Sequence, residues 1–165
     1  MKEPVYQERK DIRFPLSEDA SDIAALRSSS DKAQAIFMHL SHFEELMKTE
    51  DRYIDAASNV LMREYLKSMI EGSAQLVSGK GFDQQHIWPL RQILGFLLSA
   101  ASDIFEHDKR EGYVGGVITT GNLIKQLFDT IQKANEVVGE DSGNKRLQQM
   151  SANFAALYAK QLPKQ

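Results

Sequence analysis

The segment from Ile87 to Phe105, read IWPLRQILGFLLSAASDIF, constrains the fold most because it is the most apolar stretch of the chain. Phe96, Leu98 and Ala100 widen its apolar face until little of the surface of a helix would stay polar. A helix of that kind has to be covered on several sides by other elements. We therefore predict a nearly buried central helix over about residues 87–109. The spacing of three and four that indicates a helix is carried by Ile87, Leu90, Ile93, Leu94, Leu97, Ala101, Ile104 and Phe105.

The other apolar residues follow the same helical period, in segments that polar or glycine-rich joints separate. A first short segment begins near Ser17 and breaks at the serines before Asp31, where Ser30 is a suitable N-cap for the next helix. A long helix is expected to begin near Thr49 and to end at Gly79 and Gly81. A turn at Gly112 should start a further helix, and the last helix should cover 145–161. No useful β-alternation occurs, so we predict an all-α protein, an antiparallel helical bundle of five or six helices.

Length and composition place this bundle in one domain. We expect a single domain over residues 17–162, preceded by an extended arm over 1–16 and followed by a tail over 163–165. The chain has no cysteine, which excludes thiolate metal sites and fits a reducing compartment. The charged N-terminal residues do not form a secretory signal, and no apolar run reaches the roughly 20 residues of a membrane span. A cytoplasmic protein is the expectation.

A metal site is one functional hypothesis. His39 and His42 lie three residues apart, so they would share a helix face, and Glu45 follows one turn later. Imidazole and carboxylate together suit zinc, manganese or iron. His86 and His107, near the ends of the central helix, are further candidate ligands, although a straight helix would hold them roughly 30 Å apart. The spacing matches no known metal signature, so solvent-facing or core-edge histidines are favoured and no cofactor is expected.

Acid–base and nucleotide chemistry find little support. Asp103 and Glu106 form a carboxylate pair at the C-terminal end of an apolar helix, where an acid is mildly misplaced, but a solvated last turn explains them. The glycines at 115, 116 and 121 follow no strand, so a dinucleotide-binding loop is excluded, and turn residues or close helix contacts are the interpretation. The lack of a catalytic signature favours a non-enzymatic protein over an enzyme.

Two groups of residues are candidates for binding a partner. Phe82 and Trp88 flank the start of the central helix and Tyr113 follows its end, where exposed aromatic side chains would be hot spots for a protein. A hydrophobic plug that closes the bundle is the favoured interpretation of these aromatic residues. Lys145 and Arg146 open a C-terminal helix without acidic residues, which could bind nucleic acid weakly. The net charge of −3 and the sparse cations argue against nucleic acid as the main partner.

These observations favour a non-enzymatic protein that acts through protein–protein contact, as an adaptor, an inhibitor or an assembly subunit. A homodimer is considered because so apolar a central helix could need cover from a second chain. The first alternative is a metal- or small-ligand-binding bundle that uses His39, His42 and Glu45. The second is weak nucleic-acid binding through the C-terminal helix.

Overall fold

A computed structural model describes residues 21–48, 56–139 and 143–161. Within these ranges the chain forms helices and no strand, which confirms the predicted all-α bundle. The arm over 1–16, the helix starts at Ser17 and Thr49 and the tail over 163–165 lie outside the described residues. The helices are α2 (Ser21–Arg27), α3 (Asp31–Lys48), α4 (Ala56–Ser78), α5 (Gln84–Glu111), α6 (Val114–Val137) and α7 (Asn144–Gln161).

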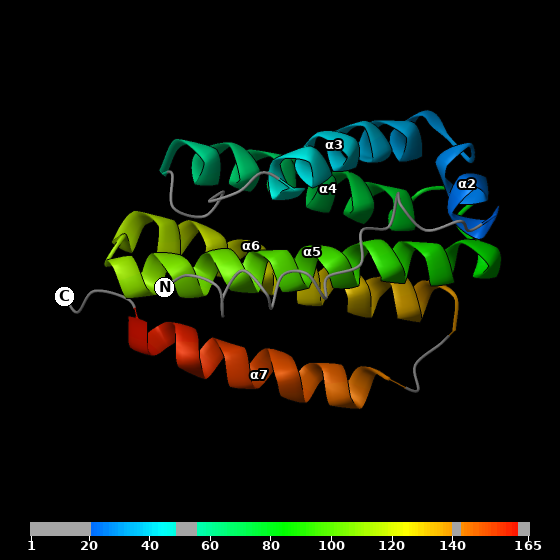
Figure 1. Cartoon of the computed structure of the whole chain (residues 1–165). Helices are drawn as coiled ribbons and strands as arrows, with labels where there is room; N and C mark the ends of the chain where they lie inside the picture. Colours follow the sequence, from blue (N-terminus) through cyan, green and yellow to red (C-terminus); the bar gives the residue numbers. More distant parts are fainter. Residues whose placement is uncertain (1–20, 49–55, 140–142, 162–165) are drawn as a thin grey trace.

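The helices stack in layers (Figure 1). α3 and α4 lie side by side above α5 and α6, and α7 lies below them, against α6. Successive long helices run in opposite directions, so α4 and α6 run parallel to each other and antiparallel to α5. The end of α5 and the starts of α4 and α6 therefore share one end of the bundle, which we call the α5–α6 end.

α5 is the predicted central helix. It begins three residues before the predicted start and ends two residues after the predicted end, and 14 of its 28 residues are buried. Ile93, Leu94 and Leu97 have no exposed surface at all. A single chain thus covers the apolar faces of α5, so this helix gives no reason to expect a homodimer. In the described ranges no helix is long and apolar enough to cross a membrane.

A capping box explains why α5 begins at Gln84. The side chain of Asp83 accepts a hydrogen bond from the Gln85 amide at 3.2 Å, and the Asp83 amide donates to His86 Nδ1 at 3.4 Å. Histidine here takes the place that glutamate usually has in such a box. His86 therefore stabilises the start of α5 by accepting this hydrogen bond.

Two joints between the described helices lie where the sequence predicts them. Ser30 caps α3 by accepting a hydrogen bond from the Ala33 amide at 3.1 Å. α5 ends at Gly112, whose φ of 76° is a left-handed conformation that suits glycine. The next helix starts only two residues later, so α6 is forced back antiparallel along α5.

Two glycines of α6 allow close helix contacts rather than turns. A Cβ atom on Gly121 would overlap the ring of Tyr158 from α7. A Cβ atom on Gly116 would overlap the carboxylate of Asp108 from α5. The predicted close-packing role is thus confirmed for these two positions, whereas Gly115 lies within α6 with open space around it.

Candidate functional site

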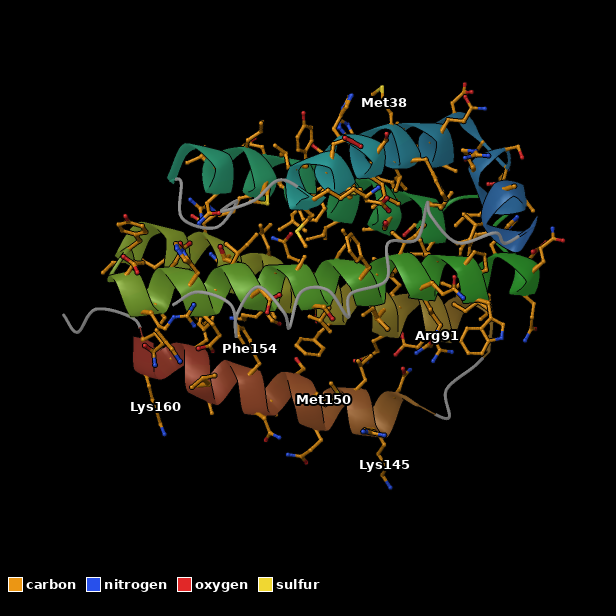
Figure 2. The ribbon with its side chains drawn as sticks, in the orientation of Figure 1. Met38, Arg91, Lys145, Met150, Phe154 and Lys160 are labelled. Atoms are coloured by element: carbon orange, nitrogen blue, oxygen red, sulfur yellow. The ribbon has the colours of Figure 1, made fainter. Side chains whose placement is uncertain are left out.

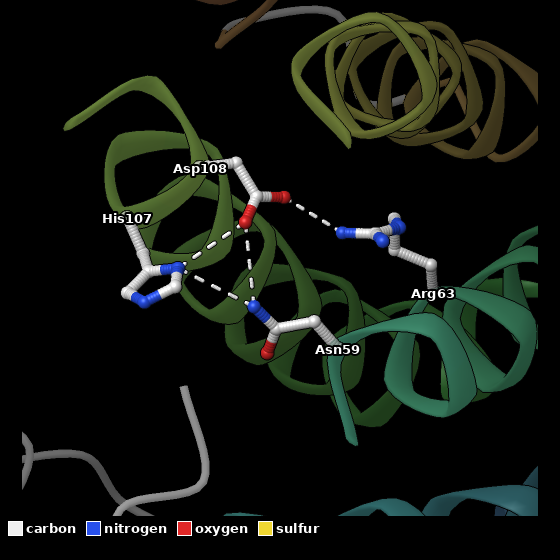
Figure 3. Close-up of polar contacts among 4 residues, drawn as sticks. All are labelled: Asn59, Arg63, His107 and Asp108. Atoms are coloured by element: carbon white, nitrogen blue, oxygen red, sulfur yellow. Dashed lines mark hydrogen bonds and ion pairs between the residues drawn. The ribbon is translucent and has the colours of Figure 1, made fainter. Parts of the chain in front are cut away.

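The most chemically diverse site in the described residues is a buried polar network at the α5–α6 end (Figure 3). Asp108 lies at its centre with 1% of its side chain exposed. One carboxylate oxygen, Oδ2, pairs with Arg63 Nη1 at 2.7 Å. The other, Oδ1, accepts a hydrogen bond from Asn59 Nδ2 at 3.3 Å and lies 3.2 Å from His107 Nδ1. Both oxygens of the buried carboxylate are therefore engaged.

Helical spacing places these four groups together. Asn59 and Arg63 are four residues apart on α4, so both face α5. His107 and Asp108 belong to the last turns of α5, and His107 Nδ1 also lies 3.4 Å from Asn59 Nδ2. Gly116 leaves room on α6 for the carboxylate, because any larger side chain would occupy the same space. The network thus joins three helices.

The arrangement suits a structural link better than catalysis. An imidazole beside a carboxylate can serve as an acid–base pair. Here, however, the carboxylate of Asp108 is already bound by the Arg63 guanidinium and the Asn59 amide. These polar contacts stand where apolar packing would otherwise join the helices. Nδ1 of His107 faces the Asn59 amide and the Asp108 carboxylate, and neither group is a hydroxyl that a base could activate. The network therefore fixes how the end of α5 sits between α4 and α6.

Sequence reasoning missed this network. It singled out Asp103 and Glu106 in the last turns of α5, but Glu106 forms a surface ion pair with Lys109 at 3.0 Å. The same argument, an acid misplaced at a helix C-terminus, applies more strongly to Asp108, which lies next to the last-turn cations. The signal was present in the sequence, and only the fold shows that Arg63 compensates the misplaced charge.

The predicted metal ligands gain no geometric support. Both His39 and His42 lie against the ring of Tyr65, at centroid distances of 5.9 and 5.7 Å. Glu45 is exposed on the same helix. In the parts of the chain that are described, no group of three or more histidine, aspartate or glutamate residues is arranged to hold a metal ion. The metal hypothesis stays an untested prediction.

The predicted partner-binding residues do not form one surface. Trp88 is 64% exposed and its ring stacks with the Arg91 guanidinium at 5.2 Å, so the favoured interpretation of Trp88 as a plug of the bundle is wrong. Phe82, half-buried, lies against His86 near the same helix start. Tyr113 lies at the opposite end of α5. Lys145 and Arg146 are exposed in the first turn of α7.

Exposed apolar side chains gather at the α5–α6 end. Val60 and Leu61 follow Asn59 on α4 and are 54% and 43% exposed. Tyr113 and Val114 open α6 and are 44% and 48% exposed. The Tyr113 ring lies 6.4 Å from the His107 ring, and Val60 and Leu61 follow the network residue Asn59 along α4. We call these four residues the end patch: Val60, Leu61, Tyr113 and Val114.

Comparison with known proteins adds no assignment to this geometry. No family model, no curated protein and no solved structure matches the chain.

Proposed function

We propose that the protein is a non-enzymatic binding protein that docks a protein partner with the end patch. The observation that carries the proposal is that four exposed apolar side chains lie at the end of the bundle where a buried polar network joins α4 to α5. Water-exposed apolar surface that is concentrated at one place is typical of an interface. An adaptor, an inhibitor or an assembly subunit would use such a surface.

The polar network supports this proposal through rigidity. Association orders flexible groups at a cost in free energy, and a surface that is fixed beforehand avoids part of that cost. Asp108 ties α4 to α5, and it occupies the space that Gly116 leaves on α6. These contacts tie the two helix starts that carry the end patch to the end of α5 before a partner arrives.

The composition of the end patch also favours a protein as the partner. Tyr113 combines a large apolar ring with a hydroxyl group, and tyrosine is enriched among the residues that dominate binding energy. The other three side chains are aliphatic and carry no charge that would attract nucleic acid. The absence of cysteine from the whole sequence is compatible with a place of action in the cytoplasm.

A comparison of three immobilised proteins tests the proposal. Each immobilised protein is used to capture proteins from a lysate of the source organism. The three are the wild-type chain, the variant Val60→Ser/Val114→Ser and the control Met38→Ser. Met38 is a matched control because it is as exposed as Val60, at 54%, but lies on α3. We expect the same proteins to be retained by wild type and control, and to be lost from the end-patch variant.

Circular dichroism has to show equal helicity for all three proteins. If no protein is retained at micromolar concentrations, or if the end-patch variant retains the same set as the wild type, the end patch is not a docking surface.

A further inference from the structure

The C-terminal helix α7 differs in charge from the other described helices. It contains three cations, Lys145, Arg146 and Lys160, and no acidic residue. In the described residues outside α7, 11 lysines and arginines face 13 aspartates and glutamates, so that part of the chain has a net charge of −2, against +3 for α7. Such a separation of charge favours an acidic partner at α7 and disfavours the same partner elsewhere on the surface.

The apolar face of α7 is wider than the part of it that packs against the rest of the bundle. Leu147 and Phe154 pack against the core, and Phe154 lies between α7 and α5 with its ring 5.3 Å from that of Phe105 (Figure 2). Met150 and Leu157 remain 43% and 39% exposed. At roughly 100° per residue, these two lie about 60° round the helix from Leu147 and Phe154. The apolar face therefore continues past the contact with α6.

Cations flank this exposed apolar edge at both ends. Arg146 and Lys160 are exposed and fall in the same helical stripe as Met150 and Leu157, at steps of four, seven and three residues. We call these four residues the α7 seam. The two cations are about 21 Å apart along the axis at roughly 1.5 Å per residue. The seam is thus a short apolar strip with a positive charge at each end.

We propose that the α7 seam docks an amphipathic helix of another protein whose acidic residues lie at both ends of a short apolar stripe. Leucine-like side chains of that helix would cover Met150 and Leu157, as helices do when an apolar stripe is laid against another. Its acidic residues would meet Arg146 and Lys160, which sets the register and the orientation. This surface is separate from the end patch, so the inference goes beyond the function proposed above.

The charge pattern disfavours other occupants of the seam. Two copies of α7 in antiparallel contact would bring Arg146 of each copy to Lys160 of the other, and like charges that face each other oppose association. Nucleic acid fits poorly, since a strand carries a phosphate about every 3.4 Å while the seam has no cation over its central 21 Å or so. Two partly exposed apolar residues are also a small area for insertion into a lipid surface.

Fluorescence anisotropy with a designed peptide tests the inference on the full chain. The probe is a labelled helical peptide of about 18 residues, long enough to span the seam at roughly 1.5 Å per residue. It carries two leucines seven residues apart and two glutamates in each terminal turn, and the control peptide carries lysines in place of those glutamates. We expect saturable binding of the acidic peptide that weakens with added salt, and none of the lysine peptide.

Matched variants locate the binding site. Arg146→Glu/Lys160→Glu should weaken binding of the acidic peptide by about tenfold or more, since both end charges become repulsive. Lys67→Glu/Lys133→Glu changes the net charge equally at exposed positions of α4 and α6, and it should have a much smaller effect. Val60→Ser/Val114→Ser should bind the peptide like the wild type, which separates this test from that of the end patch.

Four results would overturn the inference. The first is that the acidic peptide does not bind saturably, and the second is that the lysine peptide binds equally well. The third is an equal loss of acidic-peptide binding in the two charge-reversal variants. The fourth is that duplex DNA or phosphatidylserine vesicles bind more tightly than the acidic peptide, through Arg146 and Lys160. The last result would identify nucleic acid or a membrane surface as the occupant.

Discussion

Replacement of Asp108 by alanine tests whether the polar network holds the bundle together. The change removes the ion pair with Arg63 and the contacts with Asn59 and His107, and it leaves the guanidinium without its carboxylate. Loss of one partner from a buried ion pair costs about 3–5 kcal/mol. Arg63 keeps 15% of its side chain exposed and stays partly hydrated, so we expect the lower end, about 3 kcal/mol.

Urea unfolding followed by circular dichroism measures this free energy. For a domain of this size, about 1 kcal/mol corresponds to roughly 2–4 °C in Tm, so Asp108→Ala should lower Tm by about 6–12 °C. Asp108→Asn keeps the shape and one acceptor oxygen and should cost less. A double-mutant cycle with Arg63→Met isolates the pair, for which we expect a favourable coupling of at least about 1 kcal/mol.

Two results would contradict a stabilising role for this ion pair. A loss below about 1 kcal/mol for Asp108→Ala, which is the range of an exposed ion pair, would mean that water screens the network. A coupling near zero in the cycle would mean that Arg63 and Asp108 do not stabilise each other, whatever the cost of each single change.

Two further predictions concern how α7 is held. Gly121→Ala should destabilise the protein by about 1–3 kcal/mol and speed hydrogen exchange in α7, because the new methyl group displaces the Tyr158 ring. The control is Gly95→Ala, at a helical position with open space around it, which should instead stabilise the protein by up to about 1 kcal/mol. Equal effects of the two changes on stability would contradict the packing argument. Burial raises the pKa of Tyr158 above the usual value of 10.0. Above that value the unfolded chain releases a proton that the folded chain keeps, so stability should fall as pH rises through this range. Tyr158→Phe should reduce the slope of unfolding free energy against pH, and an unchanged slope would show that this hydroxyl is not the cause.

The sequence by itself determined the helices and their joints. Helix formation depends on period, caps and glycines, and these are local features of the chain. The apolar period identified α5, Ser30 identified the start of α3, and Gly112 identified the turn into α6. The start of α5 was displaced by three residues because the capping box at Asp83 uses His86 where glutamate is expected.

Only the tertiary structure decided which residues meet. Arg63 and Asp108 are 45 positions apart, and no local pattern links them until α4 and α5 pack side by side. The exposure of Trp88 was likewise open, since the same residue could have closed the bundle or faced water. Periodicity tells which face of a helix is apolar, but it does not tell how much of that face a neighbour covers. The end patch and the α7 seam include apolar side chains that the packing of the described helices leaves exposed, so they became visible only once those helices were in place.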